Sequence, residues 1–284
     1  MYNLKLSRFN IKRDFMGIIK HILFIILCII TLFPLYFILN TSFKSKIEFI
    51  VNKISIPKIF TFENYITAFR GKAFLLWTLS TLILTLGTIV LSTIAAILIS
   101  YVIAKRKFPG REKILNFIIC LMLVSPIVII IPLFVLFTEI KLINNYIGLI
   151  LIYSGLVLPF SIYLLTSFFK TIPDSLIEAA HIDGCTDIGI IFKIITPLSS
   201  APIITLIIVN ALYVWSEFIF ALTFLQSDKL KTLMVGISIY QSRYALNVPV
   251  IMAGMTLATI PMIILYICGQ KFFIRGVIAG SSKE

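Results

Sequence analysis

The sequence predicts an all-α, polytopic membrane protein with six transmembrane helices. Of its 284 residues, 60% are hydrophobic and only 13% are charged, and the mean hydropathy is +1.07. Soluble globular domains are about 45–50% apolar and about 25% charged, so this composition belongs in a lipid bilayer. A helix needs about 20 mostly apolar residues to cross a hydrocarbon core of about 30 Å. Six segments meet or approach this length, at 20–40, 74–104, 114–138, 144–168, 199–225 and 248–270.

The spans leave too little chain for a separate soluble domain, so we expect a single transmembrane domain over 1–284. The first apolar segment occupies the position of a secretory signal peptide. It contains Pro34, however, and ends in the polar run from Asn40 to Lys44 without a small-residue cleavage site, which predicts a retained helix. The linker after it predicts either a short interfacial helix at 62–69 or a connector lying on the membrane surface.

The second span, 74–104, is longer than one bilayer thickness, so it has to tilt, kink or protrude. Small and hydroxyl residues recur along its whole length. Because such residues let membrane helices approach closely, we expect this span to be a central, packed helix. Prolines in the next two spans each leave a backbone carbonyl without its helical partner. Kinks are therefore expected at Pro126, Pro132 and Pro159.

Basic residues gather beside the spans. One cluster lies between Lys5 and Lys20, before the first span, and another runs from Lys105 to Lys113, between the second and third spans. Cytoplasmic loops of membrane proteins carry an excess of Lys and Arg. We therefore expect a multi-pass protein of the cell membrane, with both termini and the loop 170–198 in the cytoplasm. Membrane topology accounts for the net charge of +13, and no nucleic-acid partner is predicted.

Patterns for catalysis or metal binding are absent from the sequence. The only Gly-Lys pair, Gly71-Lys72, lacks the upstream glycine of a phosphate-binding loop, because Ile66 occupies that place. Neither His21 nor His181 belongs to a catalytic pattern, and the four cysteines have no paired spacing. We predict no catalytic residue, no metal, no cofactor and no disulfide.

The loop 170–198 predicts two short helices bent at a glycine. Pro173 suits the first turn of a helix, where its missing N–H costs nothing. Gly184 can supply the left-handed residue that ends this helix. Thr186 can then cap a second short helix, which Pro197 ends before the fifth span.

A motif of fixed spacing crosses this bend. It consists of Glu-Ala-Ala, three residues, Gly, nine residues, Ile, one residue, Leu and Pro. This chain matches six of the seven positions and has Thr196 in place of the Leu. In this spacing the loop resembles the EAA loop of the permease subunits of ABC importers. The matching residues are Glu178, Ala179, Ala180, Gly184, Ile194 and Pro197.

The resemblance extends over nearly the whole chain. Further segments, together with the long loop after the first span, are similar to carbohydrate-type permeases, and in particular to the second, smaller permease of maltose-type importers. These segments are 101–111, 131–133, 144–149, 215–218 and 269–280.

The resemblance implies a permease subunit without catalytic residues of its own. It also implies that ATP-driven closure of separate ATPase subunits moves the loop 170–198 and rocks the permease pair between inward and outward access. The implied partners are a second permease, two ATP-binding-cassette ATPase subunits, an extracytoplasmic solute-binding protein and the lipid bilayer. The residues implied in ATPase coupling are Glu178, Ala179, Ala180, Asp183, Gly184 and Pro197.

The fifth span carries the densest polar and aromatic set inside any span. Ionisable groups in a membrane are costly and usually face a cavity or a partner, so this set predicts part of a substrate path. Its rings can stack on sugar faces while its amide and carboxylate bond to hydroxyls. The alternative places Trp215 in the aromatic belt and Glu217 at the outer interface or bonded to a neighbouring helix. The set is Asn210, Tyr213, Trp215 and Glu217.

Three alternatives to a sugar importer remain open. One is an ABC permease for another solute, such as an amino acid, a peptide or a phosphoester. A secondary transporter is disfavoured by the EAA spacing and by the lack of acid pairs in the middle of the spans. An intramembrane enzyme is disfavoured because paired catalytic groups are absent.

Overall fold

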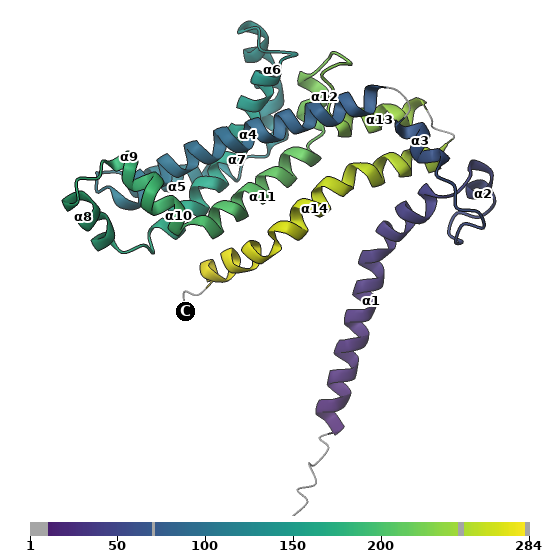
Figure 1. The fold of residues 1–284 in the computed structure, drawn as a ribbon, viewed down its shortest axis with the longest axis horizontal. Helices are drawn as coiled ribbons and strands as arrows, with labels where there is room; N and C mark the ends of the chain where they lie inside the picture. The colour runs from purple at the N-terminus through teal and green to yellow at the C-terminus, as the bar shows by residue number, and fades with distance from the viewer. Residues whose placement is uncertain (1–10, 70–71, 244–246, 282–284) are drawn as a thin grey trace, which may run out of the picture. The chain divides into compact units, whose positions relative to one another are not determined.

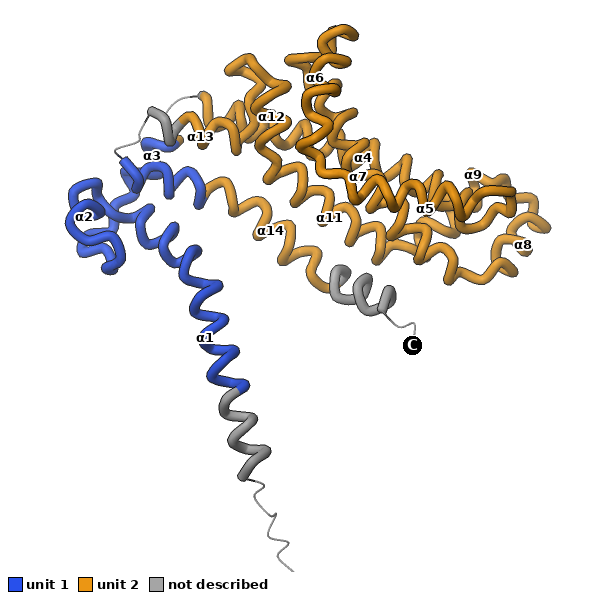
Figure 2. The backbone as a smooth tube through the Cα atoms, turned by 180° about the vertical axis from the view of Figure 1, so that it is seen from behind, with its two compact units in different colours: residues 1–68, 244–256 blue, residues 69–243, 257–284 orange. Residues whose placement is uncertain are grey.

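Every regular element in the described part of the chain is a helix, which confirms the predicted fold class. The computed structural model describes residues 11–69, 72–243 and 247–281 (Figure 1). These residues divide into two compact units (Figure 2).

The smaller unit comprises residues 1–68 and 244–256. The helix α3 lies where the sequence predicts a short helix after the first span, whereas α2 is not anticipated. The helices of this unit are α1 (Ile11–Ser42), α2 (Lys46–Val51), most of α3 (Glu63–Phe69) and the first part of α14 (Val248–Ser281).

The larger unit comprises residues 69–243 and 257–284. Besides the rest of α14, its elements are α4 (Lys72–Lys105), α5 (Arg111–Leu121), the 3-10 turn η1 (Pro126–Ile129), α6 (Ile130–Glu139), α7 (Tyr146–Phe169), α8 (Asp174–Ile182), α9 (Asp187–Ile190), the π-helical turn η2 (Ile191–Ile195), α10 (Thr196–Leu198), α11 (Ser200–Ser216), α12 (Ile219–Phe224) and α13 (Leu233–Arg243).

Four helices among the described residues are long and apolar enough to cross a membrane. They coincide with the expected first, second, fourth and sixth spans. Two further pairs of helices, each bent at a break, bring the number of spans to six if each bent pair is one span. The four helices are Lys20–Ser42, Ala73–Lys105, Tyr146–Phe169 and Val248–Lys271.

The expected third span, 114–138, is broken rather than kinked. α5 ends at Leu121 and the chain resumes its helical course at Pro126, with an angle of 90° between the two parts. Proline cannot continue a helix, because it lacks the N–H, but it begins one at no cost. By contrast, Pro132 lies in the first turn of α6, and Pro159 lies inside the continuous helix α7.

The bend before α11 also differs from expectation. Pro197 is expected to end the helix that follows Gly184, but it lies within α10, and the chain turns by 83° around Ser199. In a regular α-helix the proline ring clashes with the carbonyl four residues earlier. Here the preceding turn is the π-helical η2, whose wider hydrogen-bonded loop accommodates the ring.

The expected fifth span, 199–225, consists of two helices. α11 ends at Ser216, Glu217 is extended (φ −68°, ψ 134°), and α12 follows. The Glu217 carboxylate accepts hydrogen bonds from the backbone N–H groups of Phe220 (2.8 Å) and Ala221 (3.1 Å). Because these N–H groups have no partner within their own helix, the carboxylate starts α12 and ends α11.

In the larger unit, α4 packs along α7 and α11, as its small residues predict (Figure 1). At Gly87, a side-chain Cβ would lie 2.6 Å from Cδ1 of Ile150 in α7, so a larger residue would require the Ile150 side chain to shift. Ser100 of α4 donates a hydrogen bond of 3.1 Å to the backbone carbonyl of Ile162 in α7. α8 and α9 lie at one end of this packed group, and α12 and α13 lie at the other.

Candidate coupling loop and membrane cavity

The loop 170–198, called the coupling loop here after the role that the sequence resemblance implies, folds into two short helices bent at Gly184. Gly184 has φ +78°, a left-handed conformation that favours glycine. Its N–H donates to the carbonyl of His181 (3.0 Å), and the next N–H, of Cys185, donates to the carbonyl of Ala180 (2.9 Å), which closes α8. The hydroxyl of Thr186 accepts the N–H of Gly189 at 3.2 Å and begins α9. The predicted bend and cap are therefore confirmed.

The two faces of α8 have different environments. Ile177 and Ala180 are buried in a hydrophobic cluster with Tyr101 of α4 and Phe169 of α7. Glu178, Ala179 and Asp183 are exposed, as are the neighbouring Ile182 and Ile188 and the more distant Pro197. The loop is thus held by one face and presents the other, which combines a carboxylate, a small residue and large apolar side chains.

Ile182 and Ile188 are the residues of this surface that the sequence analysis missed. They are 86% and 67% exposed, on either side of the bend. Neither belongs to the spaced motif. The sequence pattern that indicates them is a large apolar residue close to the glycine turn of an otherwise polar loop.

Two basic residues hold the loop, Lys105 at the end of α4 and Arg106 directly after it. The Lys105 ammonium lies 2.7 Å from the Asp174 carboxylate and also donates to the backbone carbonyl of Ile172. Arg106 pairs with Asp187 at the start of α9. The carboxyl end of α4 and the residue after it therefore bind both helices of the coupling loop.

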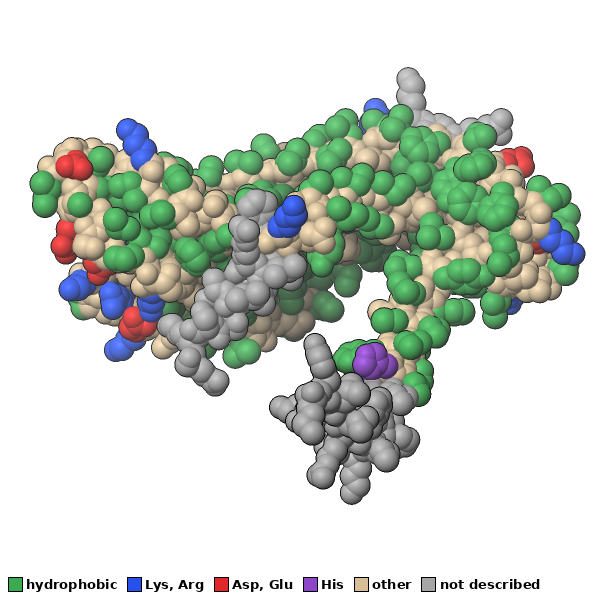
Figure 3. Space-filling model, turned by 60° about the horizontal axis from the view of Figure 1, so that its bottom comes forward, with side chains coloured by type: hydrophobic (Ala, Val, Ile, Leu, Met, Phe, Trp, Pro, Cys, Tyr) green, Lys and Arg blue, Asp and Glu red, His purple; other side chains and the backbone are tan. Residues whose placement is uncertain are grey.

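Asp187 collects further contacts from the same region. The Tyr101 hydroxyl and the His181 imidazole each lie 3.5 Å from its Oδ1 atom. At Asp174, the hydrogen bond and the positive charge of Lys105 hold the pKa of the carboxyl below its ordinary value. Figure 3 shows acidic and basic side chains gathered at this end of the larger unit, next to a broad hydrophobic band.

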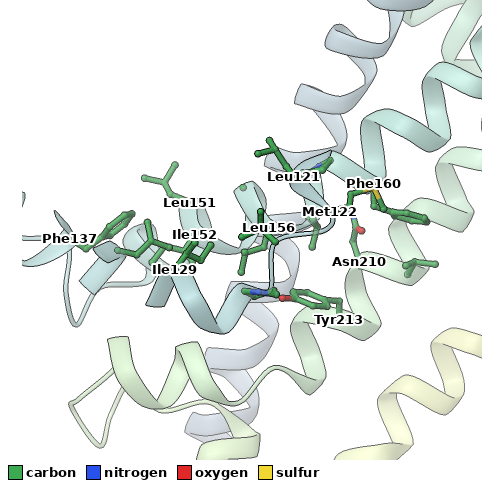
Figure 4. A pocket seen from close by; sticks show the side chains of 17 residues that line it. Leu121, Met122, Ile129, Phe137, Leu151, Ile152, Leu156, Phe160, Asn210 and Tyr213 are labelled. Atoms are coloured by element: carbon green, nitrogen blue, oxygen red, sulfur yellow. The ribbon is translucent and has the colours of Figure 1, made fainter. Parts of the chain in front are cut away.

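A cavity of about 640 Å³ lies in the larger unit, in the angle of the broken third span (Figure 4). Its wall is mostly apolar and comes from α5, η1, α6, α7 and α11. Asn210 and Tyr213, one turn apart on α11, supply an amide and a phenol to this wall. The amide of Asn210 is 1% exposed and donates to the Ser161 hydroxyl at 3.0 Å, whereas Tyr213 is partly exposed.

The other two polar residues expected on the substrate path lie elsewhere. Trp215 is 2% exposed, and its indole N–H donates to the carbonyl of Ala258 in α14 at 3.0 Å. Besides capping α12, Glu217 accepts a hydrogen bond of 2.5 Å from the Tyr153 hydroxyl of α7. The structure thus brings Asn210 and Tyr213 together at the cavity and engages Trp215 and Glu217 in contacts between helices.

Metal chemistry receives no support from the described residues, which contain no group of three His, Cys, Asp or Glu side chains able to hold an ion. The cavity offers hydrogen-bonding and stacking groups, and the loop offers a surface for a partner. Both arrangements suit binding and movement.

Comparisons with known proteins agree with this arrangement. The sulfoquinovosyl glycerol transport system permease of Agrobacterium fabrum is 35% identical, over 91% of this chain and 91% of its own length. The arabinooligosaccharides transport system permease of Bacillus subtilis is 32% identical, over 92% of this chain and 93% of its own. In fold, the chain is similar to one chain of a bacterial ABC transporter that imports the acidic polysaccharide alginate. That match has a TM-score of 0.81 and 23% identity, and covers 95% of this chain and 100% of the other.

A family profile gives the most general result. The profile described as "binding-protein-dependent transport system inner membrane component" matches residues 96–279, which include the coupling loop and the cavity-lining part of α11. With several apolar helices, the chain is a multi-pass protein of the inner membrane. The chain therefore belongs to the family of binding-protein-dependent transport system inner membrane components.

Proposed function

We propose that this chain is a permease subunit of an ABC importer for a sugar or an oligosaccharide. The observation that carries the proposal is the coupling loop, whose motif residues Glu178, Ala179 and Gly184 are exposed while contacts with α4, Arg106 and α7 hold the loop in place. The sugar assignment is supported by the transport systems of the relatives, which carry sulfoquinovosyl glycerol and arabinooligosaccharides. The chain itself is assigned no catalytic step.

The partners follow from this role. They are a second permease, two ATP-binding-cassette ATPase subunits and an extracytoplasmic solute-binding protein. The coupling loop and both termini face the cytoplasm, because the basic clusters lie on the same side of the spans. Labelling of single cysteines in intact cells tests this orientation. A cysteine at Asn52 should react with a membrane-impermeant reagent, and one at Arg111 or at His181 should not. Reaction at His181 would reverse the topology.

For the coupling itself, we propose that Glu178, Ala179, Asp183, Gly184 and Pro197 form or shape the ATPase contact, while Ala180 anchors it from within. Glu178 is exposed and can meet a basic group, and Ala179 keeps the surface low enough to enter a groove. ATPase closure then moves α8, and the ion pairs of Lys105 and Arg106 pass that movement to α4.

Two substitutions test the coupling. Glu178→Lys reverses the charge of the contact, and Gly184→Val places a branched side chain at φ +78°, a strain of roughly 1–2 kcal/mol. Both variants should reach the membrane normally while ATPase recovery by co-purification, or sugar uptake, falls. Gly110→Val is the matched control, because Gly110 has φ +88° in the turn between α4 and α5, outside the coupling loop. Normal uptake and normal ATPase recovery with both test substitutions combined would refute the assignment.

The substrate path is proposed to include Asn210 and Tyr213 at the cavity, with Trp215 and Glu217 as positioning residues behind them. A phenol ring can stack on a sugar face, and an amide discriminates hydroxyl positions, because a buried polar group without a partner costs about 1–3 kcal/mol. Asn210→Ala and Tyr213→Phe should therefore change the ranking of transported sugars in an uptake panel. A uniform fall for all sugars would assign these residues to packing or gating.

A further inference from the structure

The segment 43–66, here called the post-span loop, follows α1 directly and has two of its polar side chains turned inward. Lys44 is fully buried, and its ammonium donates to the backbone carbonyls of Asn52 (3.0 Å) and Lys53 (3.1 Å). Asn64 is buried as well, and its amide donates to the carbonyls of Ser42 (2.8 Å) and Lys44 (2.7 Å). The loop thus satisfies its own backbone carbonyls with buried side chains.

The apolar side chains of the same loop point outward. Within 47–60, six of them are between 61% and 80% exposed, a higher exposure than that of most residues on the apolar helix α1. A polar interior with an apolar exterior is the reverse of a water-soluble loop. It is the arrangement that a non-aqueous surrounding requires, since backbone groups there have no water to bond. The six are Ile47, Ile50, Val51, Ile56, Ile59 and Phe60.

Chain continuity fixes the depth of the loop. The apolar part of α1, Lys20–Ser42, has 23 residues, and only its last three residues are buried within the protein. At a rise of about 1.5 Å per residue it spans about 35 Å, slightly more than a hydrocarbon core of about 30 Å. The post-span loop begins at the next residue, so it starts at the boundary between acyl chains and headgroups.

The chemistry of the loop suits this boundary. The ring of Phe43 lies 5.8 Å from that of Phe60 and 5.2 Å from that of Tyr65, and the Tyr65 hydroxyl bonds to Ser42 at 2.7 Å. Clusters of aromatic residues with one polar end are enriched at membrane–water interfaces. The exposed Lys46, Lys53 and Lys58 add positive charge next to this apolar surface, where lipid phosphates lie.

We propose that the post-span loop is a membrane anchor. It lies in the headgroup layer at the carboxyl end of α1, with the side chains of Ile50 and Ile59 inserted among the acyl chains and the exposed lysines at the phosphates. The hydrogen bonds of the buried Lys44 ammonium fix the loop backbone in the conformation that turns the apolar side chains outward. This inference needs only that α1 spans the membrane, so it stands apart from the choice of transported solute.

Spin labelling of the assembled importer tests the proposal. Single cysteines at Ile50, Ile59 and Lys53 are labelled in a background in which Cys28, Cys120, Cys185 and Cys268 are replaced by serine. The importer is reconstituted in vesicles of phosphatidylethanolamine and phosphatidylglycerol, and each label's collisions with oxygen and with a water-soluble nickel complex are measured. Lys53 is the matched control, because it is exposed in the same loop but polar.

Labels at Ile50 and Ile59 should favour oxygen and report a depth of about 5–10 Å, the depth to which interfacial apolar faces insert. The label at Lys53 should favour nickel. Nickel access at Ile50 and Ile59 equal to that at Lys53 would overturn the proposal, because the loop would then face water. Shielding of both positions from oxygen and nickel alike would also overturn it, and would assign the surface to the second permease or to the binding protein.

Discussion

The coupling loop and the polar residues at 210–217 contain similar kinds of side chains, but those of the loop are exposed whereas most of those at 210–217 bond to neighbouring helices. In the coupling loop, Glu178 and Asp183 are exposed, and the basic residues that hold the loop through Asp174 and Asp187 lie outside the motif. In α11, by contrast, Trp215 is itself engaged in contacts with a neighbouring helix. The difference teaches that a conspicuous polar residue signals a binding surface only where other residues support it.

The depth of each region in the membrane explains the contrast. The coupling loop lies among charged groups at one end of the larger unit, where a carboxylate can remain exposed. An acid or an indole N–H within a span has no water partner, so it must bond to protein. Glu217 therefore bonds to two backbone N–H groups and to Tyr153.

The largest expected effect comes from Trp215→Ala. The change empties a buried site and leaves the Ala258 carbonyl without its donor, which should cost about 3–5 kcal/mol of stability. The melting temperature of the purified importer should fall, and uptake should fall equally for every sugar. Tyr213→Ala, at a partly exposed site, should lower the melting temperature less. A normal melting temperature with an altered sugar preference would place Trp215 on the substrate path and break the comparison.

Next in size is Glu217→Gln. A glutamine amide nitrogen cannot accept the N–H groups that the carboxylate bonds, and hydrogen bonds to charged groups are worth about 1.5–3 kcal/mol. We expect destabilisation of that order by denaturant titration, and a smaller loss for Tyr153→Phe. Because the two residues share one hydrogen bond, their losses should not add. The exposed Glu139 supplies the control, since Glu139→Gln should leave the midpoint unchanged.

At the coupling loop, loss of an ion pair should alter function more than stability. The Arg106–Asp187 pair is about half exposed, so Arg106→Ala should cost about 0–1 kcal/mol of stability. Uptake per ATP hydrolysed should nevertheless fall, with ATPase subunits still bound, because α9 loses its ion pair with the residue that follows α4. Lys107→Ala is the control, since it removes the basic residue next to Arg106, which is a partner in neither ion pair.

Charge exchange sharpens the same test. Arg106→Asp combined with Asp187→Arg should restore uptake per ATP above that of either single variant. If the exchange does not restore uptake per ATP although the doubly substituted chain assembles normally with its partners, the pair is a surface contact without a role in coupling.

The smallest effect is the pH dependence at Asp174. Lys105 lowers the pKa of this carboxyl in the folded protein, so the pair stabilises the fold above the ordinary value of 3.8. That stability is lost as the pH falls below 3.8 through the lowered pKa. At pH 6, Asp174→Asn should therefore melt at a slightly lower temperature than the unmodified chain. The loss in free energy of unfolding should be less than about 1 kcal/mol, because the carboxylate is largely exposed. The melting temperatures of the two proteins should become equal as the pH falls below the lowered pKa. A difference that persists there would show that charge is not its cause.

Sequence alone predicts those features of the coupling loop that depend on neighbouring residues. The positive φ of Gly184 follows from its place after a helix, and the cap of α9 follows from Thr186. The ion pair between Lys105 and Asp174 cannot be predicted in this way, because it joins residues 69 positions apart. Likewise, the bend stands at Ser199 rather than Pro197 because a π-helical turn absorbs the proline.

By itself, the sequence determined the helical membrane class, the four long spans, the bent coupling loop and the family, because hydropathy, helix caps and motif spacing are local properties. The tertiary structure alone decided which polar residues are available. Asn210 and Tyr213 meet at a cavity, whereas Glu217 is taken up by Tyr153, 64 positions away, and Trp215 by α14. The physical reason is that each buried donor or acceptor must find a partner, and packing of distant helices determines which partner is within reach.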